Sequence, residues 1–208
     1  TIIEHFGSLN VKLLYIGAKN NVFNSLVEFF AKMKQGTIYG LTPLVNDTAV
    51  GEEFFEEAKA TGHYVELDPT MSIEEAKKYV NEMDILYTDT WVDMEFFNNP
   101  AYAQQKEETL AKMMPYQIND ELMEGSKAIV LHDMPMHVGF EISQSVIDKN
   151  LDYILNQLLF ILLYIIPFGK GPKNYKSIVF IVVIIAVYFV YNVVACHACN
   201  EKDGQCCY

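Results

Sequence analysis

The sequence predicts an α/β domain built on a doubly wound parallel sheet. From residue 11 to about residue 157, short apolar runs of strand length alternate with segments that carry apolar residues at helical spacing. Clusters of polar residues follow three of these apolar runs, at the carboxyl ends of strands where sheets of this kind bind their ligands. We therefore expect a Rossmann-like domain with helices on both faces of the sheet.

The predicted elements alternate along the chain. The apolar runs predict strands at residues 11–17, 37–41, 63–67, 84–88 and 127–131. Apolar residues at helical spacing predict helices between them at residues 20–34, 51–61 and 72–81. The last of these helices starts with Ser72 and Glu75, whose spacing is that of a capping box.

The character of the sequence changes abruptly after Gln157. A short apolar run at residues 158–168 is followed by a lysine-bearing link and a second apolar run at residues 178–195. The second run just reaches the length of about 18 residues that can span a bilayer. We therefore predict a domain over residues 1–157 and an apolar, helical tail over residues 158–208, with a possible transmembrane segment at 178–195.

The composition excludes some classes of partner. The chain has 27 acidic and 15 basic residues and a net charge of −12, the wrong sign for binding nucleic acid or anionic lipid headgroups. It contains no arginine, so a strong phosphate site would need lysine, backbone N–H groups or another chain. The four cysteines all lie in the tail, and the main body therefore suits a reducing, cytoplasmic compartment. Because the chain starts at Thr1 and shows no secretory signal before Val11, we expect its N-terminus to be a cut end.

The first polar cluster, residues 15–21, leaves a strand through Gly17 and enters a helix whose first turn offers free N–H groups. It lacks the second and third glycines of a dinucleotide fingerprint, and we predict no cofactor. Asn20 and Asn21 are candidates for ligand contact. The alternative is that one of them is only the N-cap of the helix.

The second cluster, residues 87–95, places three carboxylates and the single tryptophan just after a strand. Asp89, Asp93 and Glu95 are suited to holding a cationic amine beside an apolar wall. The alternative is a solvated loop with Trp91 buried in the core.

The third cluster, residues 131–137, combines two histidines and an acid at another strand end. His132 and Asp133 are candidates for proton transfer, and His137 is interpreted as a surface or capping residue. We predict no metal site here, because the main body offers no further histidine or cysteine at ligand spacing.

The order and spacing of these segments resemble the second half of ornithine carbamoyltransferases, within the aspartate/ornithine carbamoyltransferase family. The resemblance covers residues 1 to about 157 and rests on collinear segments at residues 4–7, 15–21, 89–94, 115–119, 132–135 and 146–148. It implies an amino-acid-binding domain of an enzyme that transfers a carbamoyl group from carbamoyl phosphate to the δ-amine of ornithine, giving citrulline and phosphate. It also implies a homotrimer for the full-length family.

The resemblance assigns roles to single residues. Asn21, Asp89, Asp93 and Met94 fall where the family contacts the α-amino end of ornithine. Asp133 stands where the family has a cysteine that takes part in removing the proton from the substrate amine, next to His132. The backbone carbonyls of Asp133 and Met134 would meet the carbamoyl NH₂ group.

The sequence departs from the family pattern in ways that change these expectations. Asp93 replaces a serine and Glu95 a glycine, which makes the site more acidic and gives an amine other than ornithine as the alternative acceptor. The arginine-bearing phosphate loop belongs to a domain that would precede Thr1, and residues 158–161 replace the family's Ala-Glu-Asn-Arg. We expect this chain to be inactive by itself.

The tail leaves alternatives open. One is a misread exon boundary or frameshift after Gln157. A second is a non-catalytic, membrane-anchored amino-acid-binding module held by residues 178–195, with Lys170, Lys173 and Lys176 on the cytoplasmic side. A third is a small zinc knuckle formed by the tail cysteines, Cys196, Cys199, Cys206 and Cys207.

Overall fold

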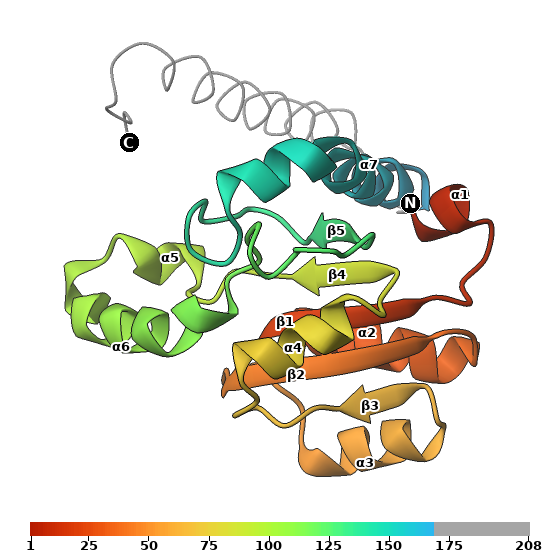
Figure 1. Ribbon diagram of the computed structural model, residues 1–208, viewed down its shortest axis with the longest axis horizontal. Coiled ribbons are helices and arrows are strands. Elements are labelled where there is room, and N and C mark those ends of the chain that lie inside the picture. Colours follow the sequence, from red (N-terminus) through yellow and green to blue (C-terminus); the bar gives the residue numbers. More distant parts are fainter. Residues whose placement is uncertain (169–208) are drawn as a thin grey trace. The chain divides into compact units, whose positions relative to one another are not determined.

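The computed structural model describes residues 1–168, without the side chains of residues 94, 95 and 158–168. A parallel sheet of five strands occupies its centre, in the order β3-β2-β1-β4-β5 (Figure 1). The strands are β1 (Lys12–Lys19), β2 (Thr37–Val45), β3 (Tyr64–Glu66), β4 (Ile85–Thr88) and β5 (Ile129–His132). All five coincide with predicted strands. β1 and β2 run further than expected, because their pairing resumes after a register shift between Ile16 and Ala18.

Helices connect the strands. They are α1 (Ile2–Phe6), α2 (Asn21–Met33), α3 (Glu52–Ala60), α4 (Ile73–Val80), α5 (Met94–Phe97), α6 (Ala103–Met113) and α7 (Gln144–Phe168). The predicted helices are confirmed as α2, α3 and α4, and the capping box of Ser72 and Glu75 is present at the start of α4. None of the helices within residues 1–168 is long and apolar enough to cross a membrane. The possible transmembrane segment at 178–195 and the tail cysteines lie outside the described residues.

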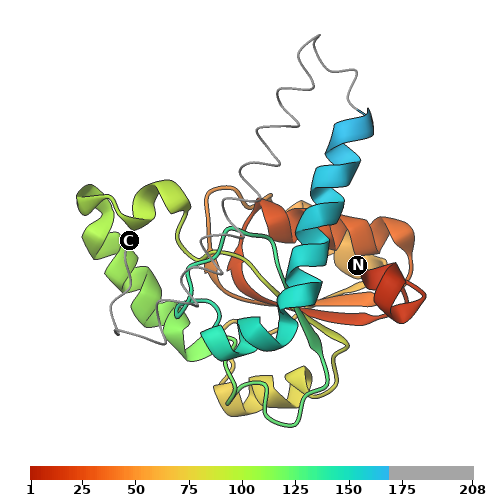
Figure 2. The same cartoon turned by 90° about the horizontal axis from the view of Figure 1, so that it is seen from above.

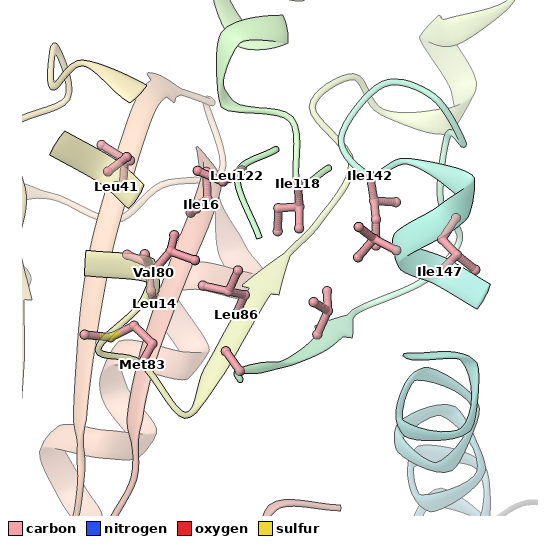
Figure 3. Close-up of a cluster of buried hydrophobic side chains, with 14 of the residues drawn as sticks. Leu14, Ile16, Leu41, Val80, Met83, Leu86, Ile118, Leu122, Ile142 and Ile147 are labelled. Carbon is pink, nitrogen blue, oxygen red and sulfur yellow. The ribbon is translucent and has the colours of Figure 1, made fainter. Parts of the chain in front are cut away.

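The sheet separates two apolar clusters. Alternate residues of β1 point to opposite faces, so that Leu13 and Tyr15 join one cluster while Leu14 and Ile16 join the other. The first cluster packs against α2 and α3, mainly through Phe23, Val27, Phe30, Phe55 and Ala58. The second includes Val80 of α4 and Ile147 of α7, and Figure 3 shows its side chains between the sheet and these helices. Strands buried on both faces explain why the sequence shows continuous apolar runs instead of alternation.

The strand order determines where a ligand can bind. The chain moves outward from β1 to β2 and β3, and then crosses back to place β4 on the other side of β1. This reversal leaves a crevice at the carboxyl ends of β1 and β4, the usual ligand position in open α/β sheets. The segment with α5 and α6 lies beyond the carboxyl end of β4, to one side of the sheet (Figures 1 and 2).

The outer strand β5 is covered on its free edge by α7. The Asn150 side-chain oxygen accepts a hydrogen bond of 2.9 Å from the backbone N–H of Val130, and its amide donates to Val146 within the helix. At the opposite edge, β3 has only three residues. Glu66 at its end pairs with Lys19 and Lys59.

Candidate active site

The crevice between β1 and β4 holds a buried contact between Asn20 and Asp89. Asn20 is the N-cap of α2: its side-chain oxygen accepts from the Phe23 backbone N–H at 3.0 Å. Its amide nitrogen donates to Asp89 at 2.8 Å. The other Asp89 oxygen accepts from the Thr90 N–H, also at 2.8 Å. Of the two adjacent asparagines, Asn20 is thus the cap and the Asp89 partner, whereas Asn21 is the exposed first residue of α2.

Asp89 is a buried carboxyl with a second carboxyl in its vicinity. Burial raises its pKa above the ordinary value, and the charge of Asp133 adds to this increase. The hydrogen bonds from Thr90 and Asn20 and the charge interaction with His132 lower the pKa of Asp89 and stabilise its ionised form. A cation bound beside Asp89 would offset both the cost of burying its ionised form and the repulsion from Asp133.

Asp133 follows β5 and is held by a tyrosine from β4. The Tyr87 hydroxyl donates to Asp133 Oδ1 at 3.1 Å, and the Gln157 side-chain amide of α7 donates to the Tyr87 oxygen. The Tyr87 ring stacks on Tyr15 of β1, with ring centroids 6.1 Å apart. Burial raises the pKa of Tyr87 well above its ordinary value, and the charge of Asp133 adds to this. The phenol is therefore a protonated donor at neutral pH.

His132 is buried at the end of β5 and organises the loop that follows. Its Nδ1 accepts from the Met134 backbone N–H at 2.9 Å, which requires the ring proton to be on Nε2. Nε2 lies 3.4 Å from Oε1 of Glu141, a fully buried carboxyl that also accepts from the His137 backbone N–H. Both ring nitrogens thus face groups within the domain. A role for His132 in proton transfer stays a prediction.

The remaining predicted residues occupy different environments. Met134 is half-buried, with a left-handed backbone (φ 57°), and packs against the cluster in Figure 3. Asp93 is exposed and precedes α5 without a side-chain capping bond, while the side chain of Met94 is not described. Trp91 is only 2% exposed, as the alternative interpretation of its cluster expected. His137, interpreted above as a surface or capping residue, is half-buried, and its ring stacks on Phe97 at 3.6 Å.

A pocket of about 210 Å³ opens beside Trp91 and Asp93. Its lining combines two carboxylates, Asp47 and Asp93, with the ammonium of Lys106 and with aromatic rings. The lining residues come from the end of β2 and the loop after it, from the segment before α5 and α5 itself, and from α6 and the turn before it: Leu44, Val45, Asn46, Asp47, Thr48, Trp91, Val92, Asp93, Phe96, Tyr102, Gln105, Lys106 and Thr109.

Within residues 1–168, no three histidine, cysteine or acidic side chains are grouped so as to hold a metal ion. The contacts of Tyr87, Gln157 and Glu141 in this region were not predicted from the sequence. Tyr87 begins the second polar cluster, but it also ends an apolar strand run and so gave no sign of a contact with Asp133. Gln157 and Glu141 come from α7 and from a loop, and only the folded chain brings them to β4 and β5.

Comparisons with known proteins agree with this geometry. The family model for the Asp/Orn-binding domain of aspartate/ornithine carbamoyltransferase matches residues 9–162. The ornithine carbamoyltransferase of Aquifex aeolicus is 31% identical over 167 residues, covering 76% of this chain and 48% of that protein. The enzyme of the same name from Pyrobaculum aerophilum is 37% identical over 153 residues, covering 71% and 46%. The chain thus spans about half the length of these relatives.

Solved structures show the same fold. The ornithine carbamoyltransferase of Gloeobacter violaceus is 33% identical with a TM-score of 0.51, covering 71% of this chain and 46% of that one. That of Pyrococcus furiosus is 27% identical with a TM-score of 0.57, covering 71% and 45%. An aspartate transcarbamoylase from Trypanosoma cruzi shares the fold at 20% identity, with a TM-score of 0.53 and coverage of 75% and 47%. The chain belongs to the aspartate/ornithine carbamoyltransferase family, and residues 9–162 form its aspartate/ornithine-binding domain.

Proposed function

We propose that this chain supplies the acceptor-binding half of a carbamoyltransferase that acts on the δ-amine of ornithine, or on a closely related amine. The observation that carries the proposal is the buried Asp89, held by Asn20 and close enough to Asp133 for their charges to interact. A substrate ammonium group is the natural counterion for two such carboxylates.

The charge of the region favours an amine over an acidic acceptor. Recognition of the side-chain carboxylate of aspartate calls for a cationic fork such as arginine, and the chain contains no arginine. Lys19, at the end of β1, is buried with its ammonium 3.2 Å from Glu66 and 3.8 Å from the centre of the Phe55 ring. The Lys19 ammonium is therefore already paired within the domain and is not available to bind the carboxylate of an acidic acceptor.

The pocket beside Trp91 and Asp93 supports an amino acid as the ligand. Asp47 and Asp93 can accept from an α-ammonium group. Lys106, whose ammonium donates to the Phe97 carbonyl at 2.9 Å and has no carboxylate partner among the described side chains, can pair with an α-carboxylate. The exposed carboxylate of Asp93 leaves room for acceptors with a further polar group, which is the reason to include amines related to ornithine.

The reaction would proceed by direct displacement. The amine nitrogen forms a bond to the carbamoyl carbon, the bond between that carbon and the phosphate oxygen breaks, and one N–H proton passes to Asp133. The domain contributes by orienting the amine and accepting its proton. We propose that carbamoyl phosphate is bound by the other half of the enzyme, which the matched relatives contain and the domain in residues 9–162 does not.

The proposal is tested by titrating the chain with L-ornithine and L-aspartate while the backbone amides are followed by NMR. L-Ornithine is expected to shift the signals of Asn20, Thr90 and Asp133, and L-aspartate is not. Asp89→Asn should weaken ornithine binding by about tenfold, the value of one lost charged contact. Glu57→Gln, which removes one exposed charge from α3, is the matched control and should leave it unchanged. No shift with L-ornithine, or preferential binding of L-aspartate at these residues, would contradict the proposal.

A further inference from the structure

The hydroxyl group of Tyr87 lies between two side chains that come from different elements. It donates to Asp133 Oδ1 at 3.1 Å, and it accepts from the Gln157 amide. Tyr87 is in β4, Asp133 follows β5, and Gln157 is in α7. The ring is buried, so the direction in which the hydroxyl points is set by these partners and not by solvent.

The chemistry of the three groups fixes the direction of the hydrogen bonds. An ionised carboxylate only accepts, so the single phenolic proton must point toward Asp133. The phenol oxygen is then left as an acceptor, and the amide nitrogen of Gln157 is the group that donates to it. Gln157 therefore prevents the hydroxyl from turning away from Asp133.

Asp133 stands where the family has a cysteine, and a carboxylate there needs an orienting partner more than a thiol does. A cysteine presents one sulfur atom, whereas a carboxylate can rotate and exchange its two oxygens. Holding Oδ1 at Tyr87 fixes the plane of the carboxylate and leaves Oδ2 as its second acceptor atom. Asp133 also lies close enough to Asp89 for their charges to interact.

We propose that Tyr87, held by Gln157, is a positioning residue that orients Asp133 as the proton acceptor for the substrate amine. The inference rests on the proposed function. In the step concerned, the amine nitrogen of the acceptor bonds to the carbamoyl carbon, the bond from that carbon to the phosphate oxygen breaks, and one N–H proton of the amine passes to Asp133 Oδ2. Tyr87 keeps its own proton throughout, and it acts on the substrate only through Asp133.

The decisive experiment is a double-mutant cycle on the full chain. Tyr87→Phe should weaken L-ornithine binding by about tenfold, because it removes one hydrogen bond to a charged group. In an Asp133→Cys background, the same substitution should change the affinity by less than about twofold, because the thiol has no second oxygen to orient. Equal losses in both backgrounds would mean that Tyr87 is only structural, and would overturn the inference.

Two further variants test whether Gln157 acts through Tyr87 and whether the effect is specific to this tyrosine. Gln157→Leu should weaken binding in the same direction as Tyr87→Phe, and should add nothing once Tyr87 is replaced. Tyr116→Phe is the control: its hydroxyl donates to the Met71 carbonyl at 3.0 Å, away from Asp133, and the affinity should not change in either background. If the effects of Gln157→Leu and Tyr87→Phe were fully additive, Gln157 would not act through Tyr87, and the proposal would be contradicted.

A spectroscopic measurement separates this inference from the proposed function. The ¹³Cζ signal of Tyr87 reports the hydrogen bond of its hydroxyl without any ligand. It should shift in Asp133→Asn and in Gln157→Leu, but not in Tyr116→Phe. An unchanged signal in Asp133→Asn would overturn the positioning role, whereas failure of L-ornithine to bind the unsubstituted chain would overturn the proposed function instead.

Discussion

The Asn20 side chain joins the first turn of α2 to Asp89, donating to the carboxylate at 2.8 Å while its oxygen caps the helix at Phe23. One amide group thus pairs with a free N–H of the first helical turn and with the buried carboxylate that follows β4. A substitution of Asn20 removes both bonds at once, so its effect on stability exceeds that of losing an ordinary N-cap.

Asn20→Ala is expected to lower the free energy of unfolding by about 2–4 kcal/mol. An N-cap contributes about 1 kcal/mol, and a hydrogen bond to a charged group about 1.5–3 kcal/mol. Urea unfolding followed by circular dichroism measures the change. Asn21→Ala, next in the chain but exposed, should cost less than about 0.5 kcal/mol. Equal effects of the two substitutions would show that the contact with Asp89 contributes nothing.

Asp89 makes stability depend on pH in a predictable direction. Because its pKa is raised in the folded chain, the folded state keeps the proton to a higher pH than the unfolded state does. The contribution of protonated Asp89 to the free energy of unfolding is fully present below the pKa of the unfolded state. It declines as the pH rises through the pKa of the folded state. Relative to Asp89→Asn, the unsubstituted chain should therefore lose stability from pH 4 upward in urea titrations. A gain of relative stability with rising pH would refute this.

His137 gives the opposite dependence. Burial lowers its pKa, with Glu141 raising it and with His132 and Lys106 adding to the decrease. Protonation then favours the unfolded state, so stability present above the unfolded pKa of about 6.5 is lost as the pH falls. His137→Phe keeps a ring against Phe97 and should remove this acid sensitivity. Hydrogen exchange of the backbone amides of residues 94–97 at pH 5.5 and 7.5 measures this sensitivity. A variant as acid-sensitive as the unsubstituted chain would show that His137 is not its cause.

Gly40 of β2 lies so close to the Phe23 ring that a larger side chain does not fit. A Cβ atom at this position would lie 2.5 Å from the Phe23 ring, a contact that forces the core to shift. Gly40→Ala should destabilise the domain by about 1–3 kcal/mol, as overpacking does. Gly51→Ser is the matched control, because a Cβ there meets nothing within 4 Å and serine is a good N-cap for α3. Thermal unfolding of both variants would decide; equal melting temperatures would contradict the packing argument.

The sequence was sufficient to predict the sheet because the central strands β1 and β4 and the outer strand β5 are buried almost throughout and therefore appear as continuous apolar runs. It was sufficient for α4 because Ser72 and Glu75 make a local signal. It did not predict α6, whose sequence is mostly polar. Nor did it predict that α7 begins at Gln144, although the residues after Gln157 were expected to be helical.

The site was predictable only where it follows strand ends. Asp89 and Asp133 stand after β4 and β5, and parallel topology brings such positions together. The side chains that hold Asp133 were not predictable, because Tyr87 and its partner Gln157 are 70 residues apart. The roles of Asn21, Asp93, Met94 and Met134 stay predictions.

The Asn150 bond to Val130 has a consequence for the behaviour of the chain in solution. An open strand edge is a template on which a second molecule can add a strand. Here an amide side chain occupies a backbone donor of β5, while the opposite edge strand, β3, offers only three residues and a charged end. Both borders of the sheet are thus unsuited to edge-to-edge aggregation. Asn150→Ala would free one of them and should make the protein prone to associate at high concentration.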